Sequence, residues 1–92
     1  MSDSNYELVL TPPATRAIQS GLPEGVSAAV IEFLTGALVD NPQRGGKQLR
    51  GDLEGILAAR RGTYRVLYRV NEVKREVVVL RIEHRRDAYR PR

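Results

Sequence analysis

The chain has 92 residues, a net charge of +4 and no cysteine. A chain of this length forms one domain, residues 1–92, with a thin core, and the lack of cysteine excludes disulfides and thiolate metal ligands. No apolar run approaches the roughly 20 residues that span a bilayer, and residues 1–5 lack the basic start of a signal peptide, so we expect a cytoplasmic protein with no membrane contact.

A short strand and two helices are predicted in the first half of the chain. Residues 6–10 alternate between two faces and read as a strand. Thr11 can accept a hydrogen bond from the start of the first helix as its N-cap, and Gly21 ends that helix. Pro23 opens the second helix, whose apolar residues recur at i, i+3, i+4 and i+7 as far as Leu38.

A glycine-rich basic connection follows in residues 43–51. It is not a Walker loop, because its Gly-Lys pair has no Ser or Thr after it and does not come directly from a strand. We expect the glycines to serve turn geometry and the basic side chains to reach a nucleic-acid backbone. Those side chains are Arg44, Lys47 and Arg50.

Three strands are predicted in the second half, over residues 55–61, 63–70 and 76–84. The connections between them are short, which favours an antiparallel meander. The predicted fold is therefore α+β with the order β-α-α-β-β-β, in which two helices pack on one face of an antiparallel sheet.

The strand over residues 63–70 carries the first functional signal. It alternates at period two, so Tyr64 and Tyr68 share one face while Arg65 and Arg69 share the other with Leu67. We expect the tyrosines to lie in the core. Guanidinium groups beside an apolar side chain form a surface suited to phosphate, so the face with Arg65 is a candidate nucleic-acid site.

The distribution of charge supports this hypothesis. Residues 1–43 hold one basic side chain against five acidic ones, whereas residues 44–92 hold fourteen against six. Thirteen of the fifteen basic residues are arginine, which binds phosphate through two parallel hydrogen bonds. The alternative is a solvated basic face that reflects an arginine-rich genome. With one histidine, no cysteine and no acidic cluster, we expect neither a metal site nor a cofactor.

Several motifs, taken with this order of elements, resemble the RelE/ParE toxin superfamily, and most closely its RelE branch. The motifs are Leu22-Pro23, Asn41-Pro42, Gly46-Lys47-Gln48-Leu49-Arg50, Leu53-Glu54-Gly55, residues 60–68 (Arg-Arg-Gly-Thr-Tyr-Arg-Val-Leu-Tyr) and residues 84–89 (His-Arg-Arg-Asp-Ala-Tyr). The resemblance implies a RelE-like fold related to microbial ribonucleases. It also implies a ribosome-dependent cut of mRNA in the 30S decoding site and a small cognate antitoxin that wraps the toxin.

The resemblance implies four catalytic residues. The strand arginine of the family falls on Arg65, and the groups after the last strand fall on His84, Arg85 and Tyr89. We expect both arginines to hold the scissile phosphate, His84 to act as base, and Tyr89 to stack on a base or orient the ribose 2′-OH. All four should meet on one exposed side of the sheet. The ordinary alternatives are a solvated charge for Arg65 and packing roles for His84 and Tyr89.

The chain departs from the family at Ile56 and Ala58, where better-known ribonuclease members place lysines. Either another basic residue supplies the missing charge, or cleavage is weaker, altered in preference or absent. Two alternative functions therefore stay open: a ParE-like inhibitor of DNA gyrase that cleaves nothing, and a non-catalytic RNA-binding module. The predicted RNA-binding residues are Arg44, Lys47, Arg50, Arg60, Arg61, Arg69, Arg81 and Arg86.

Overall fold

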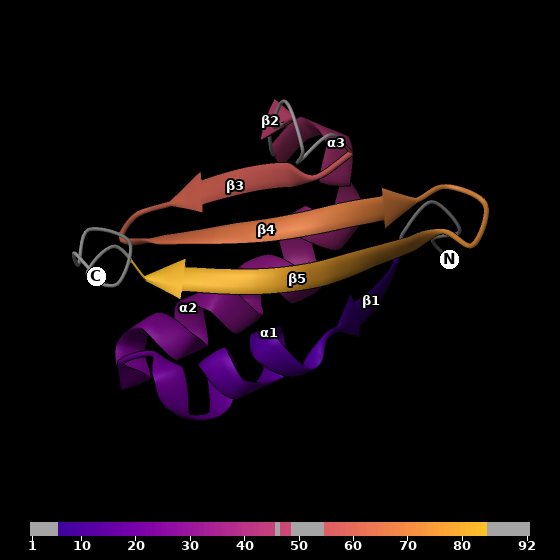
Figure 1. Cartoon of the computed structure of the whole chain (residues 1–92). Coiled ribbons are helices and arrows are strands. Elements are labelled where there is room, and N and C mark those ends of the chain that lie inside the picture. Colours follow the sequence, from indigo (N-terminus) through magenta and orange to yellow (C-terminus); the bar gives the residue numbers. More distant parts are fainter. Residues whose placement is uncertain (1–5, 46, 49–54, 85–92) are drawn as a thin grey trace.

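The computed structural model describes residues 6–45, 47–48 and 55–84. Its strands form one sheet, and its helices cover one side of that sheet (Figure 1). This arrangement confirms the predicted α+β class. The elements are β1 (Glu7–Leu10), α1 (Pro12–Arg16), α2 (Glu24–Phe33), α3 (Pro42–Gly45), β2 (Lys47–Gln48), β3 (Leu57–Arg61), β4 (Tyr64–Asn71) and β5 (Glu76–His84).

The strands are ordered β1-β5-β4-β3-β2 across the sheet. The pairs from β2 to β5 are antiparallel, as the predicted meander requires, but β1 runs parallel to β5. The sheet is therefore mixed rather than purely antiparallel. A parallel pair needs a long crossover connection, and here the helices and the meander between β1 and β5 provide it.

The helical layer follows the predicted boundaries with two local differences. Gly21 ends the first helix, although its last turn, Ala17–Gly21, is π-helical, and a second π-helical segment, Leu34–Leu38, continues α2. Thr11 makes no side-chain cap hydrogen bond; its hydroxyl proton is shared between the carbonyl oxygens of Val79 and Leu80, at 2.8 and 3.0 Å. This contact joins the start of α1 to β5.

The basic connection predicted over residues 43–51 contains two short elements, α3 and β2. Both are too short to leave a periodic pattern in the sequence, which explains why they were not predicted. In β2, Lys47 is the register partner of Ala58 in β3. This pairing adds a fifth strand at the edge of the sheet.

The core lies between the helices and the sheet. Both tyrosines of β4 belong to it, as predicted: Tyr68 is fully buried and its hydroxyl donates to the carbonyl oxygen of Pro42 at 2.5 Å. Burial raises the pKa of Tyr68 to about 12. The other fully buried large residues are Val30, Leu34, Leu38, Pro42, Val66, Val77 and Val79.

No helix in residues 6–45, 47–48 or 55–84 has the length and apolar character needed to cross a membrane.

One irregularity in β5 decides which side chains reach the uncovered side of the sheet. Tyr68 pairs with Val79, but its neighbour Leu67 pairs with Arg81, so Leu80 is an extra residue in β5. Such a bulge reverses the alternation of the strand beyond it. Arg81 and Glu83 consequently share a face with Arg65 and Leu67, as their register partners show, while Ile82 and His84 face the core side.

Candidate nucleic-acid interface

The described helices leave one side of the sheet uncovered (Figure 1). Three neighbouring strands bring arginines to this side. In the row nearest the β3–β4 hairpin, Arg60 of β3 pairs with Arg65 of β4, and Arg65 pairs with Glu83 of β5. Directly opposite residues in antiparallel strands point to the same face, so these side chains lie side by side. We call this surface the arginine face; it comprises Arg60, Arg65, Arg69, Arg81 and Glu83.

Ion pairs fix the geometry of Arg65. Its Nη2 and Nε atoms both donate to Oε1 of Glu83, at 2.5 and 3.2 Å. The other carboxylate oxygen, Oε2, lies 3.8 Å from Nε of Arg81. The side chains of Arg65 and Glu83 are 39% and 21% exposed, so this ion pair is partly buried. The Arg81 side chain is 65% exposed and extends into solvent. Arg65 is therefore held in place but remains accessible to a ligand.

The next row across the sheet has an apolar centre. Ala58 and Leu67 are register partners, and both are half-buried on the arginine face. Ile56, which precedes β3, is also half-buried. The two positions where the family resemblance predicts lysines therefore carry only apolar side chains. The backbone register sets Lys47 of β2 opposite Ala58, and Arg81 of β5 opposite Leu67, so a basic residue stands at each end of this row.

Two predicted site residues lie on the other face. Arg61 pairs with Tyr64, and its guanidinium stacks 4.7 Å from the centre of the Phe33 ring in α2. His84 also pairs with Tyr64 and is half-buried. The expectation that His84 shares one exposed face with Arg65 is therefore wrong, because the bulge at Leu80 turns its side chain to the helix-covered side.

The structure leaves the other predicted residues untested. Arg50, Arg85, Arg86 and Tyr89 lie outside the described residues. Arg44 is in α3 and Lys47 is in β2, and only their backbone positions are described. Among the predicted RNA-binding residues with described side chains, the arginine face brings together Arg60, Arg69 and Arg81.

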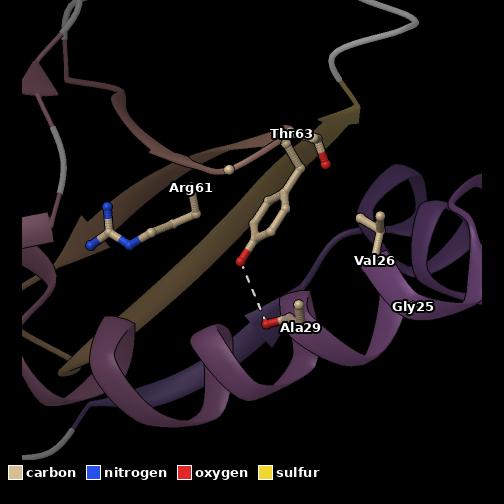
Figure 2. Close-up of a pocket in the computed structure, with 7 residues that line it drawn as sticks. Gly25, Val26, Ala29, Arg61 and Thr63 are labelled. Atoms are coloured by element: carbon tan, nitrogen blue, oxygen red, sulfur yellow. Dashed lines mark hydrogen bonds between the residues drawn. The ribbon is translucent and has the colours of Figure 1, made fainter.

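A shallow hollow of about 410 Å³ lies between α2 and the β3–β4 hairpin (Figure 2). Gly25, Val26 and Ala29 line it from the helix, and residues 61–64 line it from the hairpin. The Tyr64 hydroxyl donates to the carbonyl oxygen of Ala29 at 3.4 Å, and burial raises the pKa of this tyrosine. The hollow is mainly apolar and opens on the helix-covered side, away from the arginine face.

Sequence reasoning missed Glu83. Its face depends on the bulge at Leu80, which shows no signal in the sequence, since regular alternation from Val77 and Val79 would point Glu83 toward the core side. Only the pairing of β4 with β5 reveals that this carboxylate lies beside Arg65.

Comparisons with known proteins agree with this architecture. A family model described as the ParE toxin of the type II toxin–antitoxin system parDE matches residues 15–89. The chain is 45% identical to Toxin RelE of Mycobacterium tuberculosis over 91 residues, which cover 98% of this chain and 93% of the relative. It is 47% identical to Toxin RelG of the same organism over 85 residues, which cover 92% and 97%.

A solved structure shows the same fold. The toxin–antitoxin complex RelBE2 from M. tuberculosis contains a chain that is 46% identical to this one and superposes with a TM-score of 0.84, over 88% of this chain and 99% of that one. Both the match to the family model and the identity to the curated relatives extend over most of the sequence. The chain therefore belongs to the RelE/ParE superfamily of type II toxins.

Proposed function

We propose that the chain is the toxin of a type II toxin–antitoxin pair and inhibits translation as a metal-independent endoribonuclease. Its substrate is messenger RNA bound to the ribosome, in the decoding site of the 30S subunit. The observation that carries this proposal is the position of Arg65, which is held in a fixed orientation on a surface shared with Arg60 and Arg81. Membership of the toxin superfamily supports the choice of substrate.

The arginine face is suited to a single-stranded RNA backbone. Guanidinium groups form two parallel hydrogen bonds to a phosphate and stay charged at any physiological pH. The apolar row of Ala58 and Leu67 beside them offers van der Waals contact to a ribose or a base edge. Electrostatic attraction of this kind brings the RNA to the surface, and its strength falls as salt concentration rises.

Cleavage without a metal has three chemical requirements. The ribose 2′-OH must lose a proton to attack the adjacent phosphorus, the charge that develops on the phosphate oxygens must be stabilised, and the departing 5′-oxygen must be protonated. Arg65 meets the second requirement, since its guanidinium is preorganised before the RNA arrives. On the family resemblance we assign Arg85 to a second contact with the phosphate and Tyr89 to orientation of the 2′-OH. These two roles do not include the two proton transfers.

A cognate antitoxin protein is the second partner. The similar chain from M. tuberculosis was solved as part of a toxin–antitoxin complex. The basic second half of this chain would attract an acidic antitoxin segment, and complementary charge accelerates such an association.

Primer extension on a defined mRNA in a translating lysate tests this function. Wild-type protein is expected to create new 5′ ends in the downstream fragment of the message, and only when ribosomes occupy the message. Arg65→Ala should remove them, whereas Arg16→Ala, which deletes the same charge from exposed α1, should not. Intact message together with inhibited supercoiling by DNA gyrase would instead support the ParE-like alternative. Intact message with no effect on gyrase would support a non-catalytic RNA-binding module.

A further inference from the structure

Glu83 places a negative charge inside a surface that otherwise attracts phosphate. Its Oε1 accepts both the Nε and Nη2 donors of Arg65, and its Oε2 faces Arg81. A carboxylate at this position repels the RNA backbone, so it lowers affinity for the proposed substrate. Ion pairs on a protein surface contribute little to folding stability, so stability alone does not account for the arrangement.

The hydrogen bonds use one edge of the Arg65 guanidinium. A guanidinium is a planar fork with a side edge, formed by Nε and Nη2, and an end edge, formed by Nη1 and Nη2. Glu83 takes the side edge, and among the described residues no hydrogen bond of Arg65 uses Nη1. The end edge is the one that remains for a phosphate.

We propose that Glu83 is a positioning residue, which anchors the side edge of Arg65 so that the end edge is aimed at the scissile phosphate before RNA binds. This inference rests on the proposed ribonuclease function and assigns it a further residue. An unanchored arginine must give up the rotational freedom of its long side chain when the substrate binds. Glu83 restricts the rotation of Arg65 before the substrate binds, so less conformational entropy is lost on binding. Its negative charge also weakens the attraction for RNA.

The proposal predicts opposite effects on two measured quantities. Glu83→Gln removes the negative charge, so the affinity for a short RNA with 2′-O-methyl riboses, which cannot be cleaved, should rise about two- to fivefold at low salt. The same variant weakens the anchor of Arg65, so the single-turnover rate of cleavage on ribosome-bound mRNA should fall about tenfold or more. A purely structural role for Glu83 would lower both quantities together.

Two further variants make the comparison sharp. Glu32→Gln removes an identical charge from the exposed surface of α2 and should leave the cleavage rate at its wild-type value. Glu83→Asp keeps the charge but shortens the reach to Arg65, so it should bind the uncleavable RNA as the wild type does and still cleave more slowly. The melting temperature of each variant, measured alongside, identifies losses that come from unfolding.

A measurement without RNA tests the anchor itself. The Nε–H signal of Arg65 in a ¹H–¹⁵N spectrum should be shifted and protected from solvent exchange in the wild type and in Glu32→Gln, and should lose both properties in Glu83→Gln. Arg65→Lys identifies the signal by its disappearance. An Arg65 signal that is equally protected in Glu83→Gln would overturn the proposal.

The outcomes separate this inference from the proposed function. Loss of cleavage in Arg65→Ala, together with wild-type cleavage in Glu83→Gln, would refute the positioning role and leave the nuclease function intact. Weaker RNA binding and slower cleavage in Glu83→Gln, in step with a lower melting temperature, would also refute it. If the wild type cuts no message at all, the nuclease function fails and the proposed role for Glu83 fails with it.

Discussion

Tyr64 lies directly opposite His84 across β4 and β5, and the next pair along the strands, Arg65 and Glu83, points to the opposite face. Since Tyr64 is buried in the core, His84 belongs to the helix-covered side of the sheet. The only histidine of the chain and the central arginine of the arginine face are thus neighbours along the sheet but are separated by its thickness. A phosphate held by Arg65 therefore lies on the opposite side of the sheet from the imidazole.

This separation predicts a modest role for His84. His84→Ala should retain ribosome-dependent cleavage within about tenfold of the wild-type rate, because its side chain does not share the arginine face. The measurement is the yield of new 5′ ends in primer extension at matched protein concentration. A loss of about a hundredfold or more, the size typical of a missing catalytic group, would show that the imidazole reaches the reacting atoms.

Lys47 is predicted to supply part of the positive charge that a lysine at position 58 would provide. The two residues are register partners, which brings the backbone of β2 against the apolar row. Lys47→Ala should weaken binding of an uncleavable RNA at low salt and reduce the slope of log K against log salt by about one. Lys74→Ala, in the distant turn between β4 and β5, provides the matched control. Equal slopes for Lys47→Ala and wild type would exclude a phosphate contact by Lys47.

Tyr68 is predicted to make stability sensitive to alkaline pH. Its pKa is about 12 in the folded protein and near its ordinary value of 10.0 in the unfolded chain, so its contribution is complete below about pH 10. Above that, the unfolded chain releases the proton first, and stability falls as pH rises toward about 12. Denaturant unfolding should show this loss in the wild type and a smaller one in Tyr68→Phe.

The same substitution has a cost near neutral pH. Tyr68→Phe removes the donor to the buried Pro42 carbonyl and should lower the free energy of unfolding by about 1 to 2 kcal/mol. A variant as stable as the wild type would mean that this hydrogen bond contributes nothing.

Gly62 is predicted to be required by the β3–β4 hairpin, which sets the pairing of Arg60 with Arg65. Its φ is +57°, in the left-handed region, while no atom would obstruct a Cβ there. Gly62→Ala should therefore destabilise the protein by about 1 kcal/mol through backbone strain alone, and Gly62→Asn by less, since asparagine tolerates this conformation better. Thermal unfolding distinguishes the two, and equal melting temperatures for Gly62→Ala and wild type would contradict the strain.

Regular periodicity accounts for what the sequence could predict. The apolar stripe of the second helix and the alternation in β4 repeat over enough residues to identify both elements, and they correctly placed Tyr64 and Tyr68 in the core and Arg65 outside it. Gly21 marked the end of the first helix because the backbone preference of glycine is local. These features need no knowledge of distant parts of the chain.

The remaining features depend on contacts between distant segments. The parallel pairing of β1 with β5 and the hydrogen bonds of Thr11 to β5 join residues nearly 70 positions apart. The bulge at Leu80 has no marker such as glycine, yet it decides the faces of Arg81, Glu83 and His84. For that reason the sequence identified Arg65 correctly but assigned His84 to the wrong face and gave no role to Glu83.

The most direct measurement compares Arg65→Ala with Arg61→Ala in ribosome-dependent mRNA cleavage. The two arginines are close along the chain, but Arg65 lies on the arginine face and Arg61 stacks on Phe33 on the other side. Arg65→Ala should lower the cleavage rate by about 10² to 10³, the usual loss for one preorganised donor, and Arg61→Ala by less than about threefold. Equal rates for the two variants would contradict the arginine face as the site of cleavage.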